Sequence, residues 1–192
     1  ALTAVAAGTK CVSLGTGVNI LPQTNPLYLA KQAASLDFVS NGRFMLGLGV
    51  GWLEEEFKAL GVPFERRGAR ADDYLAAMRK VWSGEVVEHE SEFLSWHGFK
   101  SYPVPMQSPL PIVIGGSKGK ALERVARFAD GWYAPTATID QIAALLPKLD
   151  EACRKVGETR DDPEEAIGNS DEKNQGEQFS EHVVGPEEAL VP

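Results

Sequence analysis

Glycines gather at two points of the sequence where backbone amides could come close to a ligand. The first run is Gly47-x-Gly49-x-Gly51-Trp52, directly after a short apolar segment. The second is Gly115-Gly116-Ser117-Lys118, between another apolar segment and a helical pattern that Ser117 is suited to cap. Glycine has no side chain to block a ligand. Free amides at the start of a helix attract anions, and the positive charge of Lys118 strengthens this attraction. The two runs predict the binding of a bulky ligand, with an anionic group near the second run.

Strands must precede both runs if the glycines are to lie at the edge of a sheet. Phe44 to Gly49 and Pro111 to Gly116 are apolar throughout, as is typical of strands buried on both faces. Cys11 to Val18 predicts an earlier strand, and Trp132 to Ala134 predicts a later one. Helical patterns alternate with these strands, over residues 26–40, 70–82, 118–129 and 138–156. The alternation predicts a parallel sheet covered by helices, a pattern that an open doubly wound sheet and a closed barrel share.

The helix over residues 26–40 has the clearest boundaries. Asn25 is a good N-cap, Pro26 suits the first helical position, and Asn41-Gly42 supplies the stop. The apolar residues that recur at helical spacing, and so predict its buried face, are Leu27, Ala30, Ala34 and Phe38.

Three local patterns describe the second half of the chain. Val86 to Phe99 carries short alternating runs, which predict a small antiparallel hairpin. Thr138 and Gln141 form a capping box for the last helix, which Pro147 is expected to kink or split. From about Glu158 the sequence becomes polar and nearly aperiodic, which is typical of a loop or a poorly ordered tail.

Composition limits the class of protein. The chain has 192 residues, of which 43% are hydrophobic, and a formal net charge of −8. These values fit one sizeable globular domain and argue against nucleic acid or an anionic membrane as the main partner. No apolar run is long enough to span a bilayer. Cys11 and Cys153 lie far apart without CxxC spacing, so buried or incidental thiols and a cytoplasmic location are expected.

Several blocks of this sequence occur together in one known family. The central block is Asp37-x-x-Ser40-x-Gly42-Arg43-x-x-x-Gly47-x-Gly49-x-Gly51. The other blocks are Leu14-Gly-Thr-Gly-Val18, Glu65-Arg-Arg-Gly-Ala-Arg70 with the helix to Trp82, Ile114-Gly-Gly-Ser117, and Ala129-Asp-Gly-Trp132. Over roughly residues 1–157 the chain thereby resembles the bacterial-luciferase-like superfamily of flavin- and deazaflavin-dependent oxidoreductases. The resemblance implies a partial domain over 1–157 and a divergent tail over 158–192.

The family's fold is a (β/α)8 TIM barrel, and a full barrel needs about 250 residues. Because the chain begins at Ala1 inside a helical pattern, we expect a piece of a longer protein that lacks the first two strands. The resemblance thus implies an α/β fold, an incomplete (β/α)8 TIM barrel with a small β-hairpin insertion. Family members are often dimers, so a homodimer is an expected assembly.

The resemblance implies an oxidoreductase that transfers a hydride between coenzyme F420 and a small organic substrate. An FMN-dependent monooxygenase of the same superfamily is one alternative, and a truncated, non-catalytic barrel is another. The residues that the resemblance assigns to the cofactor are Gly17, Val18, Asn19, Gly49, Val50, Gly51, Trp52, Gly115, Gly116, Ser117 and Lys118. In the family, the position of Gly17–Val18 often holds a non-prolyl cis peptide against the cofactor ring, and the phosphate binds near Ser117. Packing roles stay open beside these: a tight strand exit at Gly17, a core tryptophan at Trp52 and a helix cap at Ser117.

No catalytic residue is assigned, because the catalytic groups of this family often lie on the first strands. Some sugar-phosphate dehydrogenases of the family carry a catalytic acid where Trp52 stands, which argues against that activity here. Asp37 and Arg43 are expected to form a structural ion pair across a turn. The three histidines are scattered without metal-ligand spacing and predict no metal site; they are His89, His97 and His182.

Overall fold

A computed structural model describes residues 1–160 of the chain. The chain forms two compact units, Ala1–Gly115 and a second that begins at Gly116. Most of the predicted tail, from residue 161 onward, lies outside the described residues, and so does His182. No helix within residues 1–160 is both long and apolar enough to cross a membrane.

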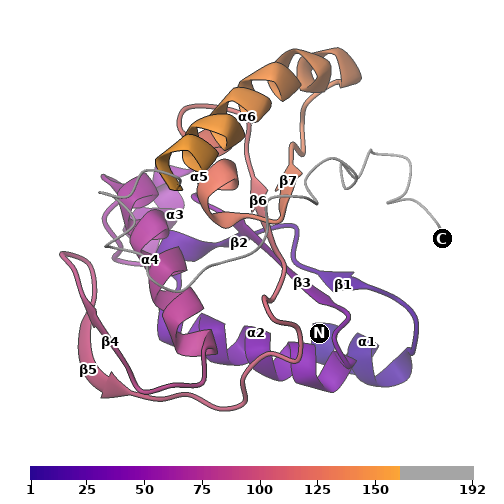
Figure 1. The fold of residues 1–192 in the computed structure, drawn as a ribbon, viewed down its shortest axis with the longest axis vertical. Helices are drawn as coiled ribbons and strands as arrows, with labels where there is room; N and C mark the ends of the chain where they lie inside the picture. Colours follow the sequence, from indigo (N-terminus) through magenta and orange to yellow (C-terminus); the bar gives the residue numbers. More distant parts are fainter. Residues whose placement is uncertain (161–192) are drawn as a thin grey trace. The chain divides into compact units, whose positions relative to one another are not determined.

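The first unit combines a parallel sheet, helices and a separate hairpin (Figure 1). Its elements are α1 (Leu2–Gly8), β1 (Leu14–Gly15), β2 (Asn19–Ile20), the short 3-10 helix η1 (Leu21–Gln23), α2 (Pro26–Ser40), β3 (Phe44–Gly49), α3 (Glu54–Ala59), α4 (Arg67–Trp82), β4 (Val87–Glu90), β5 (Ser95–Phe99) and β6 (Ile112–Gly115). The second unit contains α5 (Ala121–Phe128), β7 (Gly131–Tyr133) and α6 (Ile139–Arg160).

Strand β3 is the centre of the sheet in the first unit. It pairs in parallel with β1 and β2 at one edge and with β6 at the other. The pairing with β6 joins Leu46 to Ile112 and Leu48 to Ile114, and all four side chains are buried. These pairs confirm the prediction of a parallel sheet, and the face of β3 and β6 that carries these four side chains is buried.

Helices α2 and α4 fix the layer beside the sheet. Helix α2 packs on β3 and also against α1 and α4, while α4 packs against η1. The indole of Trp82, at the end of α4, donates a hydrogen bond of 2.9 Å to the carbonyl of Ala30 in α2. The two helices are thereby held together by a polar contact as well as by apolar packing.

Helix α2 begins and ends where the sequence predicts. The side chain of Asn25 accepts hydrogen bonds from the amides of Leu27 and Tyr28, and Asn41 ends the helix at φ 59°. The predicted buried face is partly wrong, since Phe38 is 60% exposed. The residues of α2 that are buried are Pro26, Leu29, Ala30, Ala33, Ala34, Asp37 and Ser40. The buried stripe is shifted because Asp37 and Ser40 turn inward. The Asp37 carboxylate accepts from the distant Gln107 amide, and the Ser40 hydroxyl donates to the Asp37 carbonyl and accepts from the Arg43 amide.

The expected ion pair between Asp37 and Arg43 is wrong. Arg43 donates from Nε to the carbonyl of Ser40, at 2.7 Å, and from its terminal nitrogens to three further carbonyls and a hydroxyl near the end of α1. The carboxylate of Asp37 instead accepts from Gln107. Arg43 therefore donates to backbone carbonyls, because the carbonyls at the end of α1 lie beside it and lack helical partners.

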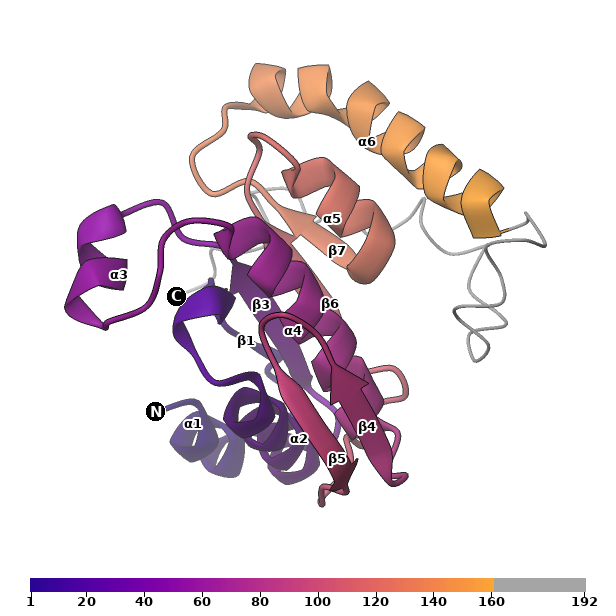
Figure 2. The same ribbon diagram turned by 90° about the vertical axis from the view of Figure 1, so that its left-hand side faces the viewer.

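The predicted hairpin is present as β4 and β5, which pair antiparallel beside α4 (Figure 2). Its inner face is fixed by His89, which is buried. Nε2 of His89 lies 2.8 Å from Oδ1 of Asp73 in α4. The ring of His89 stacks on Trp96 at 4.8 Å, and Ser91 donates to the other oxygen of Asp73. The described residues contain no group of three potential metal ligands.

The second unit confirms the predicted capping box, excludes a split of the last helix and corrects one predicted helix cap. In the capping box, the Thr138 amide donates to the Gln141 side chain at 2.9 Å, and the Gln141 amide donates to the Thr138 hydroxyl at 3.3 Å. Pro147 does not split the last helix, because α6 continues through it and packs against α5. Ser117 does not cap α5, whose N-cap is Lys120 without a side-chain hydrogen bond.

Candidate functional site

A β-bulge separates β1 from β2. Gly15 pairs with Met45, and Asn19 pairs with Leu48. Three residues of the first segment, 16–18, therefore lie opposite only two residues of β3, 46–47. The bulge is held at Thr16, whose hydroxyl donates to the carbonyl of Gly47 at 2.7 Å. Bulges of this kind re-aim side chains and are common beside binding sites.

The bulge brings three of the predicted strand ends together. The side chain of Val18 lies between two glycines: a Cβ at Gly49 would be 2.8 Å from Val18 Cγ2, and one at Gly115 would be 3.2 Å from Val18 Cγ1. Gly17 is exposed, and a Cβ there would meet nothing within 4 Å. The Gly17–Val18 peptide bond is cis, as the family resemblance implies. These residues form a floor of backbone and one apolar side chain at the carboxyl edge of the sheet.

Asn19 lies next to this floor and faces the connector to α2. Its side-chain oxygen accepts from the hydroxyl of Thr24 at 3.4 Å. This contact ties the end of the bulge to the segment that carries η1, so Asn19 helps to fix the path of the chain beside Val18.

The glycine run after β3 turns sharply away from the sheet. Gly51 has φ +77°, and a Cβ there would lie 2.7 Å from Phe57 and 2.9 Å from Ile20. Its carbonyl accepts a hydrogen bond of 2.9 Å from Nε of Arg67. Trp52 follows and is 82% exposed, so the alternative of a core tryptophan is wrong. The turn places Val50 and Trp52 beside the strand ends rather than in the core.

The second glycine run lies at the start of the second unit. Gly116 is held through both polar groups, because its amide donates to the carbonyl of Tyr133 at 2.9 Å and its carbonyl accepts from the indole of Trp132 at 2.7 Å. Within the described residues, the amides of Ser117 and Lys118 donate to no protein group. Lys118 is exposed. An anionic group could therefore be met here by free amides and a cation.

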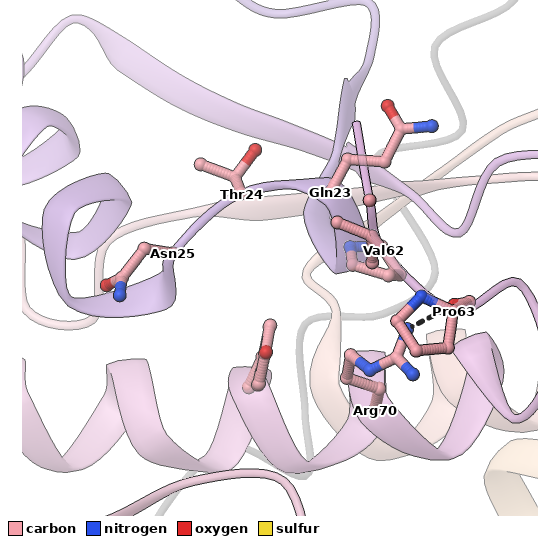
Figure 3. A pocket seen from close by; sticks show the side chains of 9 residues that line it. Gln23, Thr24, Asn25, Val62, Pro63 and Arg70 are labelled. Carbon is pink, nitrogen blue, oxygen red and sulfur yellow. Dashed lines mark hydrogen bonds between the residues drawn. The ribbon is translucent and has the colours of Figure 1, made fainter. Parts of the chain in front are cut away.

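A cavity that the sequence did not predict opens at the carboxyl side of the sheet, between the connector before α2 and the connector before α4 (Figure 3). It has a volume of about 320 Å³ and is lined by Pro22, Gln23, Thr24, Asn25, Gly61, Val62, Pro63, Arg70 and Tyr74. Arg70 is buried and donates to the carbonyl of Pro63 at 2.7 Å, the contact that Figure 3 marks. The pKa of the Tyr74 phenol is raised, mainly by burial. The charge of nearby Arg70 lowers this pKa and that of Asp73 raises it, both by less than burial does.

Sequence reasoning missed the residues that hold this floor in place. Thr16, Phe57 and Arg67 support the glycines but carry no ligand-binding pattern of their own. Arg67 belongs to the family block that begins at Glu65. The sequence therefore identified the block but not the contact of Arg67 with Gly51. Only the distances show what these residues contact.

Comparisons with known proteins show which family the chain is similar to. The family model for luciferase-like monooxygenases matches residues 1–169. An uncharacterised protein of Mycobacterium tuberculosis is 35% identical over 140 residues, which cover 72% of this chain and 50% of that protein. An F420-dependent glucose-6-phosphate dehydrogenase of Intrasporangium calvum is 30% identical over 86% of this chain and 52% of its own length. An FMNH2-dependent dimethylsulfone monooxygenase of Pseudomonas putida is 27% identical over 65% of this chain and 36% of its length.

The fold is shared with solved structures of the same kind. The crystal structure of the monooxygenase RslO1 from Streptomyces bottropensis matches with a TM-score of 0.73 and 31% identity, over 81% of this chain and 49% of that one. This chain spans about half the length of the curated relatives above, apart from the dimethylsulfone monooxygenase, of which it covers 36%. The prediction of a mixed α/β fold that forms an incomplete (β/α)8 barrel is confirmed. By sequence and by fold, the chain belongs to the luciferase-like monooxygenase family, whose members include F420-dependent and FMN-dependent oxidoreductases.

Proposed function

We propose that the protein is a coenzyme F420-dependent oxidoreductase that transfers a hydride between the deazaflavin and a small organic substrate. The observation that carries the proposal is the floor at the sheet edge, where Val18 is seated on Gly49 and Gly115 beside the open backbone of Gly17. A flat ring system needs such a surface, because a side chain at Gly17 would hold the ring away from the backbone, while side chains at Gly49 or Gly115 would displace Val18. The F420-dependent relative, at 30% identity, supports this choice of cofactor.

The residues of this chain would bind and orient the cofactor. Gly17 and Val18 would lie against the ring, while Gly49, Gly115 and Thr16 hold the bulge in place from below. When bound, coenzyme F420 supplies the hydride chemistry at C5 of its ring, so the protein's task is to position the ring and to exclude water.

The second glycine run would bind an anionic group of the cofactor. Ser117 and Lys118 offer free amides, and the Lys118 ammonium adds a positive charge. Trp132 and Tyr133 fix Gly116, so the run is held in one conformation before an anion binds. This part of the proposal rests on the second unit alone.

The residue type at Trp52 narrows the class of substrate that we propose. No carboxylate or imidazole stands at this position, where some sugar-phosphate dehydrogenases of the family carry their acid. The exposed indole offers an apolar surface instead. We therefore propose a small organic substrate other than a sugar phosphate.

Equilibrium titration of the protein with F420 and with FMN, followed by cofactor fluorescence, tests the proposal. We expect saturable binding of F420 that is tighter than that of FMN. Gly17→Leu should abolish this binding because it covers the open backbone, while Gly8→Leu, also with nothing within 4 Å of its Cβ position, is the matched control. Tighter binding of FMN would favour the monooxygenase alternative, which the Pseudomonas putida relative supports. Binding of neither cofactor would overturn the proposal for this chain and favour the non-catalytic alternative.

A further inference from the structure

We infer that Arg67 is the positioning residue of the proposed cofactor site, through its contact with the Gly51–Trp52 peptide; the inference rests on the proposed function. Nε of Arg67 donates to the carbonyl of Gly51 at 2.9 Å, across sixteen positions of sequence. Gly51 belongs to the glycine run at the strand ends, and Arg67 opens α4. One side chain therefore joins the first turn of a long helix to the loop beside the cofactor floor.

The arginine is itself fixed by aromatic packing. Its guanidinium carbon lies 3.8 Å from the centre of the Phe64 ring, and Phe64 meets Phe57 edge to face at 5.3 Å. Phe57 is fully buried and is also the side chain that a Cβ on Gly51 would strike at 2.7 Å. Gly51, Arg67, Phe64 and Phe57 thus form a closed set of contacts around the loop.

This set fixes the direction of one amide. In a trans peptide the carbonyl and the following N–H point in opposite directions, and the Gly51–Trp52 bond is not among the cis bonds. Because Arg67 holds the Gly51 carbonyl, the N–H of Trp52 points away from Arg67. Within the described residues this N–H donates to no protein group. Arg67 accordingly presents the Trp52 amide to a hydrogen-bond acceptor on the ligand, such as a ring carbonyl.

A guanidinium is suited to this task where an ammonium is not. It is planar, so one face stacks on Phe64 while an N–H in the same plane reaches the carbonyl. Lysine could supply the hydrogen bond but not the stacked plane. The conservative variant should therefore keep part of the effect.

The neighbouring Arg66 provides a matched control. It carries the same charge one position earlier, is exposed, and forms its ion pair with Glu92 of the hairpin instead of the glycine loop. Arg66→Gln removes the same charge from the same helix end without touching Gly51. A loss of net positive charge alone would affect both variants.

The experiment combines backbone 15N relaxation at Gly51 and Trp52 with F420 titration, for wild type, Arg67→Gln, Arg67→Lys and Arg66→Gln. We expect the order parameters of both amides to fall from about 0.85 to below about 0.6 in Arg67→Gln, while Arg66→Gln leaves them unchanged. F420 affinity should fall about tenfold in Arg67→Gln, the loss expected for one charge-assisted hydrogen bond, and recover in part in Arg67→Lys. If Arg67→Gln fails to fold, Phe64→Leu removes the ring that Arg67 and Phe57 pack on, keeps the Arg67 hydrogen bond, and should show a smaller change of the same kind.

The outcomes separate this inference from the proposed function. If wild type binds F420 and Arg67→Gln keeps both the wild-type order parameters and the wild-type affinity, the inference is overturned. Equal effects of Arg66→Gln and Arg67→Gln would also overturn it. If wild type binds neither F420 nor FMN, the proposed function fails and the role toward a ligand fails with it, while unchanged relaxation would show that Arg67 does not order the loop either.

Discussion

Gln107 holds the buried carboxylate of Asp37 through two donors, although seventy positions separate them in the sequence. Its backbone amide donates to Oδ2 at 2.9 Å, and its side-chain amide donates to Oδ1 at 2.6 Å. The same side-chain nitrogen also donates to the carbonyl of Phe44 at 2.8 Å. Gln107 thus joins the end of α2, the start of β3 and the proline-rich connector that leads to β6.

Replacing Gln107 by leucine is expected to destabilise the fold. The variant leaves the Asp37 carboxylate, which is fully buried, without its side-chain donor and the Phe44 carbonyl without its partner. The loss should be about 1–3 kcal/mol of unfolding free energy, measured by urea denaturation. Gln32→Leu, on the exposed side of α2, is the control and should change the value little. Equal stability of the two variants would contradict a role for the Gln107 contact.

Arg43→Lys should also destabilise the first unit, despite keeping the charge. Arg43 donates to Thr9, Val12, Ala6 and Ser40 through three nitrogens, and one ammonium cannot reach all of these acceptors. We expect a loss of about 2 kcal/mol, because several carbonyls, most of them partly buried, lose their donor. Thermal unfolding by circular dichroism measures it. Arg66→Lys, at an exposed ion pair, is the matched substitution, and a comparable loss there would refute the argument.

Gly47→Ala should be the most damaging glycine substitution in β3. A Cβ at Gly47 would lie 1.7 Å from the carbonyl oxygen of Thr16, which is backbone and cannot rotate away. The bulge would have to open, at a cost of about 3 kcal/mol or more in unfolding free energy. Denaturant unfolding measures the change. Gly8→Ala, where the added Cβ meets nothing within 4 Å, should stay within about 0.5 kcal/mol of wild type.

Stability should fall with alkaline pH because of Tyr74. Burial raises the pKa of its phenol above the ordinary value of 10.0. Below that value both the folded and the unfolded state hold the proton, so Tyr74 makes no pH-dependent contribution. Above it the unfolded state loses the proton first, so the free energy of unfolding declines until the pH exceeds the folded pKa.

The measurement is urea unfolding at a series of pH values above 9. Tyr74→Phe should flatten part of the alkaline decline, because the variant has no proton to lose. Tyr28→Phe removes a phenol that is 70% exposed and serves as the matched control. An alkaline profile of Tyr74→Phe that coincides with the wild type would contradict the assignment.

Much of the local structure followed from short patterns. Asn25 with Pro26 predicted the start of α2, and Thr138 with Gln141 predicted the capping box, because capping depends on residues two or three positions apart. The buried face of α2 was harder to predict. Phe38 is apolar yet exposed, whereas Asp37 is charged yet buried, and the reason is a partner that lies far along the chain.

The candidate site divides in the same way. The glycine runs and the parallel strands could be identified from the sequence, since a missing side chain and an apolar run are visible in the letters themselves. Why Gly47 has to be glycine was not visible, because the obstructing atom belongs to Thr16, thirty-one positions earlier. The role of Arg67 was hidden for the same reason.

The sequence by itself determined the family, the order of strands and helices, and the positions of the glycine runs. These depend on local propensity, periodicity and the absence of side chains. Only the tertiary structure decided the partners of Asp37 and Arg43, the bulge at residues 16–18 and the arginine that holds Gly51. The physical reason is that hydrogen bonds and close contacts depend on distances in space, which strand pairing sets between residues far apart in the chain.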